Sequence, residues 1–223
     1  MLKGLHLRRI FVNPSLMCAD QLRMHGEISA LIAAGADLLH IDVMDGSFVP
    51  NIQLGTELMK AIKREFSQPL DVHLMIDRPE DKLGYFPIGE GDWVSFHYKA
   101  SRNPQRCCEA IREIGAKALI ALDPETPLSV CAGLERCADG VLVMTVRPGH
   151  AGQKLIPETI EKIRRARAAM PDKIIEADGN VSYENAGIMT EAGADALVCG
   201  SSSLFSGEYG YVDAISILKG GIK

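Results

Sequence analysis

The sequence predicts an α/β protein that folds as a single (β/α)₈ barrel, or TIM barrel, over residues 1–223. Short apolar runs alternate with helical patterns along the whole chain. There are eight such runs, and dividing 223 residues among eight strand–helix units leaves roughly 28 for each, enough for a strand, a helix and two short loops. No G-x-G-x-x-G motif follows the first run, which disfavours an open sheet that binds a dinucleotide.

The eight predicted strands are almost continuously hydrophobic. Strands that are buried on both faces have this pattern, whereas strands with one solvent-facing side alternate between apolar and polar residues. In chain order the predicted strands are 10–17, 38–45, 69–76, 93–98, 116–123, 140–146, 173–179 and 196–202. The pattern therefore favours a parallel sheet that is covered by helices.

Helical patterns lie between the predicted strands. The clearest helices are predicted at 21–35, 56–66, 105–115, 159–170 and 184–193. Three of them end in the similar sequences AAGAD, EIGAK and EAGAD, so Gly35, Gly115 and Gly193 are expected to end their helices in the left-handed conformation. The segment 78–91 holds two prolines and three glycines, and we expect it to be short or irregular.

The composition argues against a nucleic-acid or membrane partner. The net charge is -5, so the chain lacks the basic surface that binds nucleic acid or an anionic membrane. Its apolar runs are far shorter than the ~18 residues that span a bilayer. The six cysteines form no C-x-x-C pair, which is ordinary for a cytosolic protein. We read no targeting signal at the N-terminus, and the sequence predicts a cytoplasmic protein that acts on a small molecule.

Histidines and aspartates occur near the carboxyl ends of three predicted strands, where barrel enzymes place their active sites. Side chains two residues apart share a face of a strand, so His40 and Asp42 point the same way. His73 and Asp178 occupy similar positions on their own strands. Two imidazoles and two carboxylates can hold one divalent ion, with zinc, iron(II), manganese or cobalt as candidates. Taken singly, a strand histidine is more often a core residue than a ligand, and spacing alone leaves a metal site and an acid/base site open.

Two glycine-containing segments predict an anion site. RPGHAGQK (147–154) follows the sixth strand, and its glycines permit a tight loop whose N–H groups can face an anion. CGSSSLF (199–205) follows the eighth strand, close to where this fold binds phosphate. Met44, Met75 and Met144 lie near strand ends, where packing is their ordinary role. Asp45, just past its strand, could equally be a turn or helix-capping residue, and His97 is left open, without a role.

Several motifs together closely resemble the ribulose-phosphate 3-epimerase family. They are NPSLMCAD, HIDVMDGSFVPN, DVHLMI, VMTVRPGHAGQKLIP and EADGN, and they run in order with matching spacing from about residue 10 to residue 206. The resemblance implies a metal-dependent barrel enzyme that inverts C3 of a ketose phosphate through a cis-enediolate. The expected reaction converts D-ribulose 5-phosphate to D-xylulose 5-phosphate.

The resemblance also implies roles for individual residues. Asp42 and Asp178 would act as acid and base, and together with His40 and His73 they would bind the metal. Ser15 and His73 would contact the substrate, on an apolar floor formed by the three methionines. The implied phosphate-binding residues are Gly149, His150, Ala151, Gly152, Gly179, Asn180, Gly200 and Ser201. Family members commonly assemble as homo-oligomers, which is the expectation for this chain.

The sequence departs from the family pattern in loops near the expected substrate. His150, Ala151 and Asn180 stand where the family usually has phenylalanine and two glycines, and Lys99 stands where a glutamate is common. The PSLMC segment, a residue other than glycine after DG and the SSLF ending lean towards D-allulose 6-phosphate 3-epimerase as an alternative. Lys99 could instead form a Schiff base in an aldolase. A barrel that binds phosphate but has lost catalysis is the third alternative.

Overall fold

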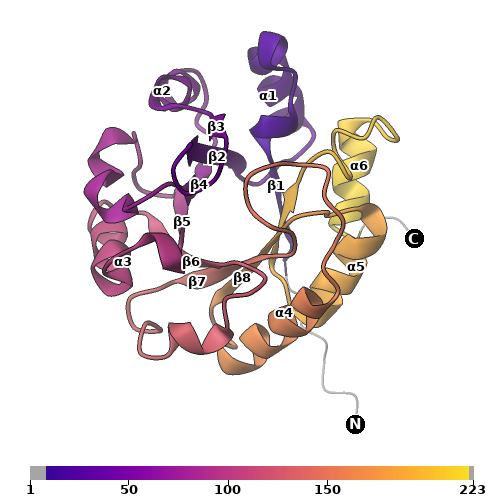
Figure 1. Cartoon of the computed structure of the whole chain (residues 1–223). Coiled ribbons are helices and arrows are strands. Elements are labelled where there is room, and N and C mark those ends of the chain that lie inside the picture. The colour runs from indigo at the N-terminus through magenta and orange to yellow at the C-terminus, as the bar shows by residue number, and fades with distance from the viewer. Residues whose placement is uncertain (1–8, 221–223) are drawn as a thin grey trace.

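The computed structural model describes residues 9–220, and within them the predicted parallel barrel is confirmed. Figure 1 looks along its axis, with the helices outside the ring of strands. The parallel strands are β1 (Phe11–Pro14), β2 (Leu39–Asp45), β4 (Leu70–Met75), β5 (Trp93–His97), β6 (Lys117–Leu122), β7 (Gly140–Met144), β8 (Ile174–Asp178) and β9 (Ala196–Cys199). Their order is β1-β9-β8-β7-β6-β5-β4-β2, and a bridge between Ser15 and His40 closes the ring. The ends of the predicted domain, residues 1–8 and 221–223, lie outside the described residues.

One short strand was not predicted. β3 (Ile52–Gln53) pairs antiparallel with Met44 and Asp45 at the end of β2. Two residues are too few to give a hydrophobic pattern, so only the pairing in space reveals this strand. It brings the loop after β2 back over the mouth of the barrel.

Five helices lie where the sequence predicts them, a sixth follows the last strand without a specific prediction, and two crossovers are irregular. The α-helices are α1 (Met24–Ala33), α2 (Thr56–Glu65), α3 (Pro104–Glu113), α4 (Glu158–Ala169), α5 (Tyr183–Ala192) and α6 (Tyr211–Leu218). Gly35, Gly115 and Gly193 have φ values of 95°, 88° and 115°, as predicted. The segment 78–91 is irregular as expected, with two 3₁₀ turns, η3 (Pro79–Asp81) and η4 (Leu83–Tyr85). Another, η6 (Leu128–Cys131), lies between β6 and β7. Among the described residues, no helix is both long and apolar enough to cross a membrane.

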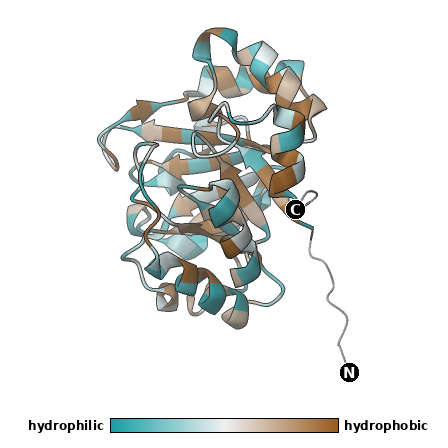
Figure 2. Ribbon diagram, turned by 90° about the vertical axis from the view of Figure 1, so that its right-hand side faces the viewer, coloured by the Kyte–Doolittle hydropathy of each residue, from teal (hydrophilic) through white to brown (hydrophobic). Residues whose placement is uncertain are grey.

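Apolar side chains fill the space on both sides of the strands. The outward faces of the strands pack against the helices in one large core, which includes Ile41, Val72 and Ile175. Along the outer helices, hydrophobic and hydrophilic residues alternate (Figure 2). Inside the barrel, Trp93 and Leu119 belong to a separate apolar cluster near the amino ends of the strands. This cluster fills the amino end of the barrel, and the pocket lined by the predicted site residues opens at the carboxyl end.

Four aspartates hold the strands together at their amino ends. Each lies just before a strand, and its carboxylate accepts the backbone N–H of a residue on the preceding barrel strand. The pairs are Asp37 with Val12, Asp92 with Leu70, Asp139 with Ala118 and Asp195 with Ile175. A basic side chain pairs with each carboxylate: Arg9 and Lys219, Lys63, Arg112, and Arg167 respectively. We call these four residues the aspartate clamps; they join β1 to β2, β4 to β5, β6 to β7 and β8 to β9.

The close approach of β7 and β8 gives a stability prediction. A Cβ atom on Gly140 would lie 2.3 Å from the carbonyl oxygen of Ile174, so Gly140→Ala must push the two strands apart. We expect urea unfolding to show a loss of about 1–3 kcal/mol in the free energy of unfolding. Gly187 in α5 has no atom within 4 Å of the same position, so Gly187→Ala should instead add about 0.5–1 kcal/mol. A Gly140→Ala protein as stable as the parent would contradict the close approach.

Candidate active site

The structure brings the four predicted metal ligands together at the carboxyl end of the barrel. Nε2 of His40 lies 3.3 Å from Oδ1 of Asp42. Nδ1 of His73 lies 3.6 Å from the same oxygen and 3.4 Å from Oδ2 of Asp178. One ligand atom from each of the four residues lies within 4.8 Å of the other three. Both histidines are fully buried, whereas the Asp178 side chain keeps 15% of its surface exposed towards the mouth.

These residues fit a divalent transition-metal ion. Two ligands about 2.1 Å from one tetrahedral ion stand about 3.4 Å apart, close to the observed spacing. His40 Nε2 and His73 Nδ1 have no hydrogen-bond partner among the described residues. Because a buried polar atom without a partner is costly, two such nitrogens beside two carboxylates favour a bound cation. The donor set suits zinc, iron(II), manganese or cobalt and does not select among them.

A second set of polar residues lies beneath the cluster, and one of them, Asp71, orients His40. Nδ1 of His40 lies 2.6 Å from Oδ2 of Asp71, which leaves Nε2 facing Asp42. The side-chain amide of Asn13 donates to both Asp71 and Glu176, at 3.1 and 2.9 Å. Burial and the neighbouring Asp71 raise the pKa of Glu176 well above its ordinary value, which favours its neutral form. Burial would lower the pKa of His40, but Asp71 and Asp42 raise it well above the usual range.

These polar residues beneath the cluster were not predicted from the sequence to belong to the site. Asn13, Asp71 and Glu176 each lie two residues before a residue that was assigned a role, namely Ser15, His73 and Asp178. Because residues i and i+2 share a face, all three point into the barrel below those residues. A search for polar residues one step further inside each strand would have found them. His97 also reaches the site, with its Nε2 2.8 Å from Nε2 of His73.

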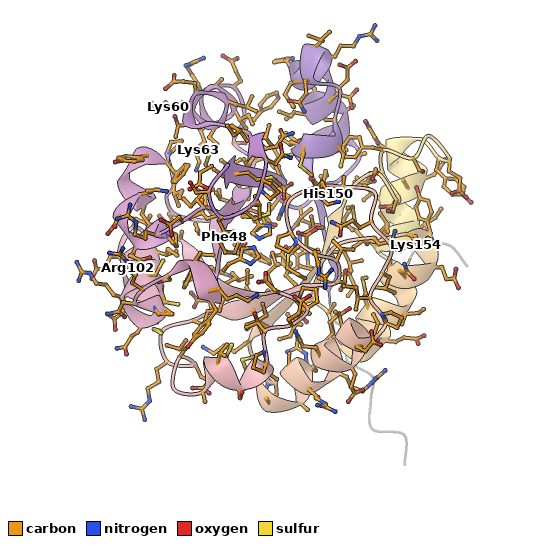
Figure 3. All side chains as sticks on the ribbon, viewed as in Figure 1. Phe48, Lys60, Lys63, Arg102, His150 and Lys154 are labelled. Carbon is orange, nitrogen blue, oxygen red and sulfur yellow. The ribbon has the colours of Figure 1, made fainter. Side chains whose placement is uncertain are left out.

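Most of the other predicted site residues line one pocket. Its lining includes Ser15, Asp42, Met44, Met75, Met144, Gly149, His150, Ala151, Gly152, Asp178, Gly179, Asn180, Gly200 and Ser201. His40 and His73 lie beneath it. The three methionines are almost fully buried, so they present an apolar wall beside the two carboxylates. In Figure 3 His150 lies on the loop over the mouth of the barrel. The pocket thus has an acidic end with methionines and an end made of glycine-containing loops.

Asn180 connects three of these loops. Its φ of 46° is left-handed, a conformation that asparagine adopts more readily than most residues other than glycine. Its side-chain oxygen accepts the N–H of Leu155 at 3.2 Å, and its side-chain nitrogen donates to Ser202 at 3.1 Å. Asn185 also donates to the same oxygen, at 3.0 Å. The loops after β7, β8 and β9 are therefore tied together at one residue.

Lys99 is paired with a carboxylate and lies outside this pocket lining. Its Nζ is 2.7 Å from Oδ2 of Asp123, and half of its side chain is exposed. A Schiff-base lysine needs a desolvated position facing the substrate. The geometry therefore disfavours the aldolase alternative and gives Lys99 a different partner.

Asp45 holds the loop that covers the methionines, as its expected turn role requires. One oxygen accepts the N–H groups of Ser47 and Phe48, and the other accepts the N–H of Asp77 and an ammonium hydrogen of Lys82. The partial burial of Asp45 would raise its pKa, but Lys82 and the three N–H groups lower it overall.

The lowered pKa of Asp45 makes the stability of this loop depend on pH. A group whose pKa is lower in the folded state stabilises the fold above its unfolded pKa of ~3.9 and loses that contribution as pH falls through the folded pKa. We expect Asp45→Asn to lower the free energy of unfolding by about 1–3 kcal/mol at pH 7. Urea unfolding at pH 7, 5 and 3.5 should show the same deficit at the first two pH values and a smaller one at the third. A deficit that is independent of pH would contradict the assignment.

The barrel, with a polar pocket at the carboxyl ends of its strands, defines the class of protein as a (β/α)₈-barrel enzyme. The profile of the Ribulose-phosphate 3 epimerase family matches residues 11–205. The chain belongs to this family and is an enzyme of the isomerase class, which confirms the resemblance seen in its motifs.

Curated relatives cover most of the chain. It is 40% identical over 219 residues to ribulose-phosphate 3-epimerase of Bacillus subtilis (strain 168), covering 95% of this chain and 99% of that protein. The chloroplastic ribulose-5-phosphate-3-epimerase of Arabidopsis thaliana is 39% identical, covering 94% of this chain and 76% of that protein. Among solved structures, phosphoribosyl anthranilate isomerase of Thermus thermophilus has a TM-score of 0.66 at 16% identity, covering 95% of this chain and 98% of that one. That likeness shows the barrel fold alone.

Proposed function

We propose that this enzyme interconverts D-ribulose 5-phosphate and D-xylulose 5-phosphate, with Asp42 and Asp178 as the acid and base. The observation that carries the proposal is the convergence of these two carboxylates, from β2 and β8, on one pocket that is also lined by glycine-containing loops. Relatives that cover most of the chain carry the name ribulose-phosphate 3-epimerase, which favours this substrate over the allulose phosphate alternative.

Inversion at C3 needs two groups that exchange protons with the same carbon. The proton next to a carbonyl is removed on one face of the carbon and replaced on the other, so one carboxylate accepts while a second donates. Burial would raise the pKa of Asp42, but His40 and His73 hold it below its usual range, and Ser15 donates to its Oδ2 at 2.6 Å. Asp42 is therefore anionic and held in place, as a base must be. Asp178 lies across His73 from it and is open to the pocket.

The remaining groups bind and orient the substrate. A divalent ion held by His40, Asp42, His73 and Asp178 supplies positive charge that stabilises the negative charge developing on the C2 and C3 oxygens. The methionines exclude water from the reacting carbon. The glycine loops and Asn180 present backbone N–H groups to the phosphate at the other end of the pocket. Assembly as a homo-oligomer and a cytoplasmic location stay predictions from the sequence.

Proton exchange with solvent tests the proposed chemistry. Zinc- or cobalt-loaded protein in D₂O is offered ribulose 5-phosphate and allulose 6-phosphate in separate tubes and followed by NMR. We expect deuterium at C3 with xylulose 5-phosphate as product, and faster turnover in the first tube. Asp42→Asn and Asp178→Asn should each reduce the rate about 10²–10⁴-fold, because each removes one of the two proton-transfer groups. Removal of the metal with a chelator should abolish turnover.

Each other outcome of that experiment has a definite meaning. Faster turnover of allulose 6-phosphate would transfer the proposal to that substrate. No exchange in either tube, with metal bound, would support a barrel that binds phosphate without catalysis. Full activity of either variant would remove that aspartate from its role.

The loop connections of Asn180 give a prediction about phosphate binding. Asn180→Gly keeps the left-handed backbone but loses the hydrogen bonds to Leu155, Ser202 and Asn185. We expect KM to rise about 5–10-fold with little change in kcat, the effect of about 1 kcal/mol of binding. Asn180→Asp keeps the accepting oxygen but adds charge near the phosphate, so its KM should rise further. An unchanged KM and unchanged inhibition by inorganic phosphate would show that these hydrogen bonds do not position the loops.

A further inference from the structure

We propose that His97 and Asp123 form a positioning pair that turns Nδ1 of His73 towards the metal-ligand cluster. The inference deepens the proposed function and rests on it in one respect, namely that the cluster holds a cation. Neither residue lines the substrate pocket. Their effect on the reaction is therefore expected to pass through His73.

The two imidazole rings meet edge to edge. Nε2 of His73 lies 2.8 Å from Nε2 of His97, and the ring planes are within 23° of parallel with centroids 4.9 Å apart. Both side chains are buried, and the ring of Phe48 covers His97 with a centroid distance of 4.7 Å. At this distance one nitrogen must carry a proton and the other must accept it.

Asp123 decides which nitrogen carries the proton. Nδ1 of His97 lies 2.7 Å from Oδ1 of Asp123, and a carboxylate only accepts. The contact lacks the geometry of a formed N–H···O hydrogen bond, but the negative charge beside Nδ1 favours the tautomer of His97 that carries its proton there and accepts with Nε2. His73 then carries its proton on Nε2, which leaves the lone pair of its Nδ1 directed at Asp42 and Asp178. Only a nitrogen with a free lone pair can bind a metal ion.

Two lysines hold Asp123 in this position. Nζ of Lys99 lies 2.7 Å from Oδ2, the oxygen that does not face His97. Nζ of Lys162, from α4, donates to the backbone oxygens of Asp123 and Pro124 at 2.7 and 2.8 Å. The Asp123 side chain is only 7% exposed. Lys99, which stands where the family commonly has a glutamate, thus makes the outermost contact of a series that runs through Asp123 and His97 to His73.

The other histidine of the cluster provides an internal comparison. Asp71 contacts Nδ1 of His40 and leaves Nε2 for the cluster, whereas His73 presents Nδ1 and is contacted at Nε2. Each histidine is turned by a buried carboxylate on its far side. For His40 that carboxylate is in direct contact, and for His73 it acts through the ring of His97.

Metal affinity and the tautomer of His73 test the inference without any measurement of turnover. His97→Phe keeps a ring of similar size but removes the acceptor, and we expect Co²⁺ and Zn²⁺ to bind 10–100-fold more weakly in chelator competition. His97→Gln restores an accepting oxygen and should recover most of the affinity. Asp123→Asn, which is nearly isosteric, should weaken binding about 10-fold. His25→Phe, a change at an exposed histidine on α1, is the matched control and should leave the affinity unchanged.

Two results would overturn the inference. ¹⁵N NMR of the zinc-loaded parent should show the proton of His73 on Nε2, and a proton on Nδ1 would refute the assignment. The inference would also be refuted if Co²⁺ bound to both His97→Phe and Asp123→Asn with an affinity within twofold of the parent. If His97→Phe does not fold, the affinity of Asp123→Asn alone decides. If both expectations were met but no exchange at C3 was seen, the positioning pair would still be supported. The proposed function would then be refuted.

Discussion

Carboxylates buried inside the barrel are the constraint on which the site depends. Asp42, Asp71, Asp123 and Glu176 are all buried, and an ionised group without a partner in such a place costs several kcal/mol. Each one has an identifiable partner or a raised pKa. Asp71 faces His40, Asp123 faces His97 and Lys99, and Glu176 is held near its neutral form. Removing any one partner would leave a charge uncompensated, so these residues function as a group.

The same constraint explains how the site is held rigid. The apolar cluster at the amino end excludes water, the lower tier of Asn13, Asp71 and Glu176 lies above it, and the ligand cluster lies above that tier. Hydrogen bonds inside such a dry interior are stronger than in water, and they fix ring orientations before any substrate arrives. The loops at the mouth contribute the backbone N–H groups that we propose bind the phosphate.

Much of this arrangement was predictable, and the exceptions have physical reasons. The barrel strands, the glycine helix ends and the convergence of His40, Asp42, His73 and Asp178 follow from hydrophobic patterning and from the two-residue period of a strand. β3 was missed because two residues carry no pattern. Asp71 and Glu176 were passed over because their partners come from other strands, and pairing across a barrel cannot be read from one strand. The contact of His97 with His73 depends on side-chain directions that sequence spacing does not give.

The aspartate clamps divide the barrel into four two-strand modules, each of which is one continuous segment of chain. Each clamp joins two strands that follow one another in the barrel, so the contact is short in sequence and each two-strand module can close locally before the ring does. The connections that contain α2, α3 and α4 lie between modules, and no clamp crosses them. A circular permutant with new termini at residues 101–103, before α3, would keep every clamped pair within one continuous segment of chain.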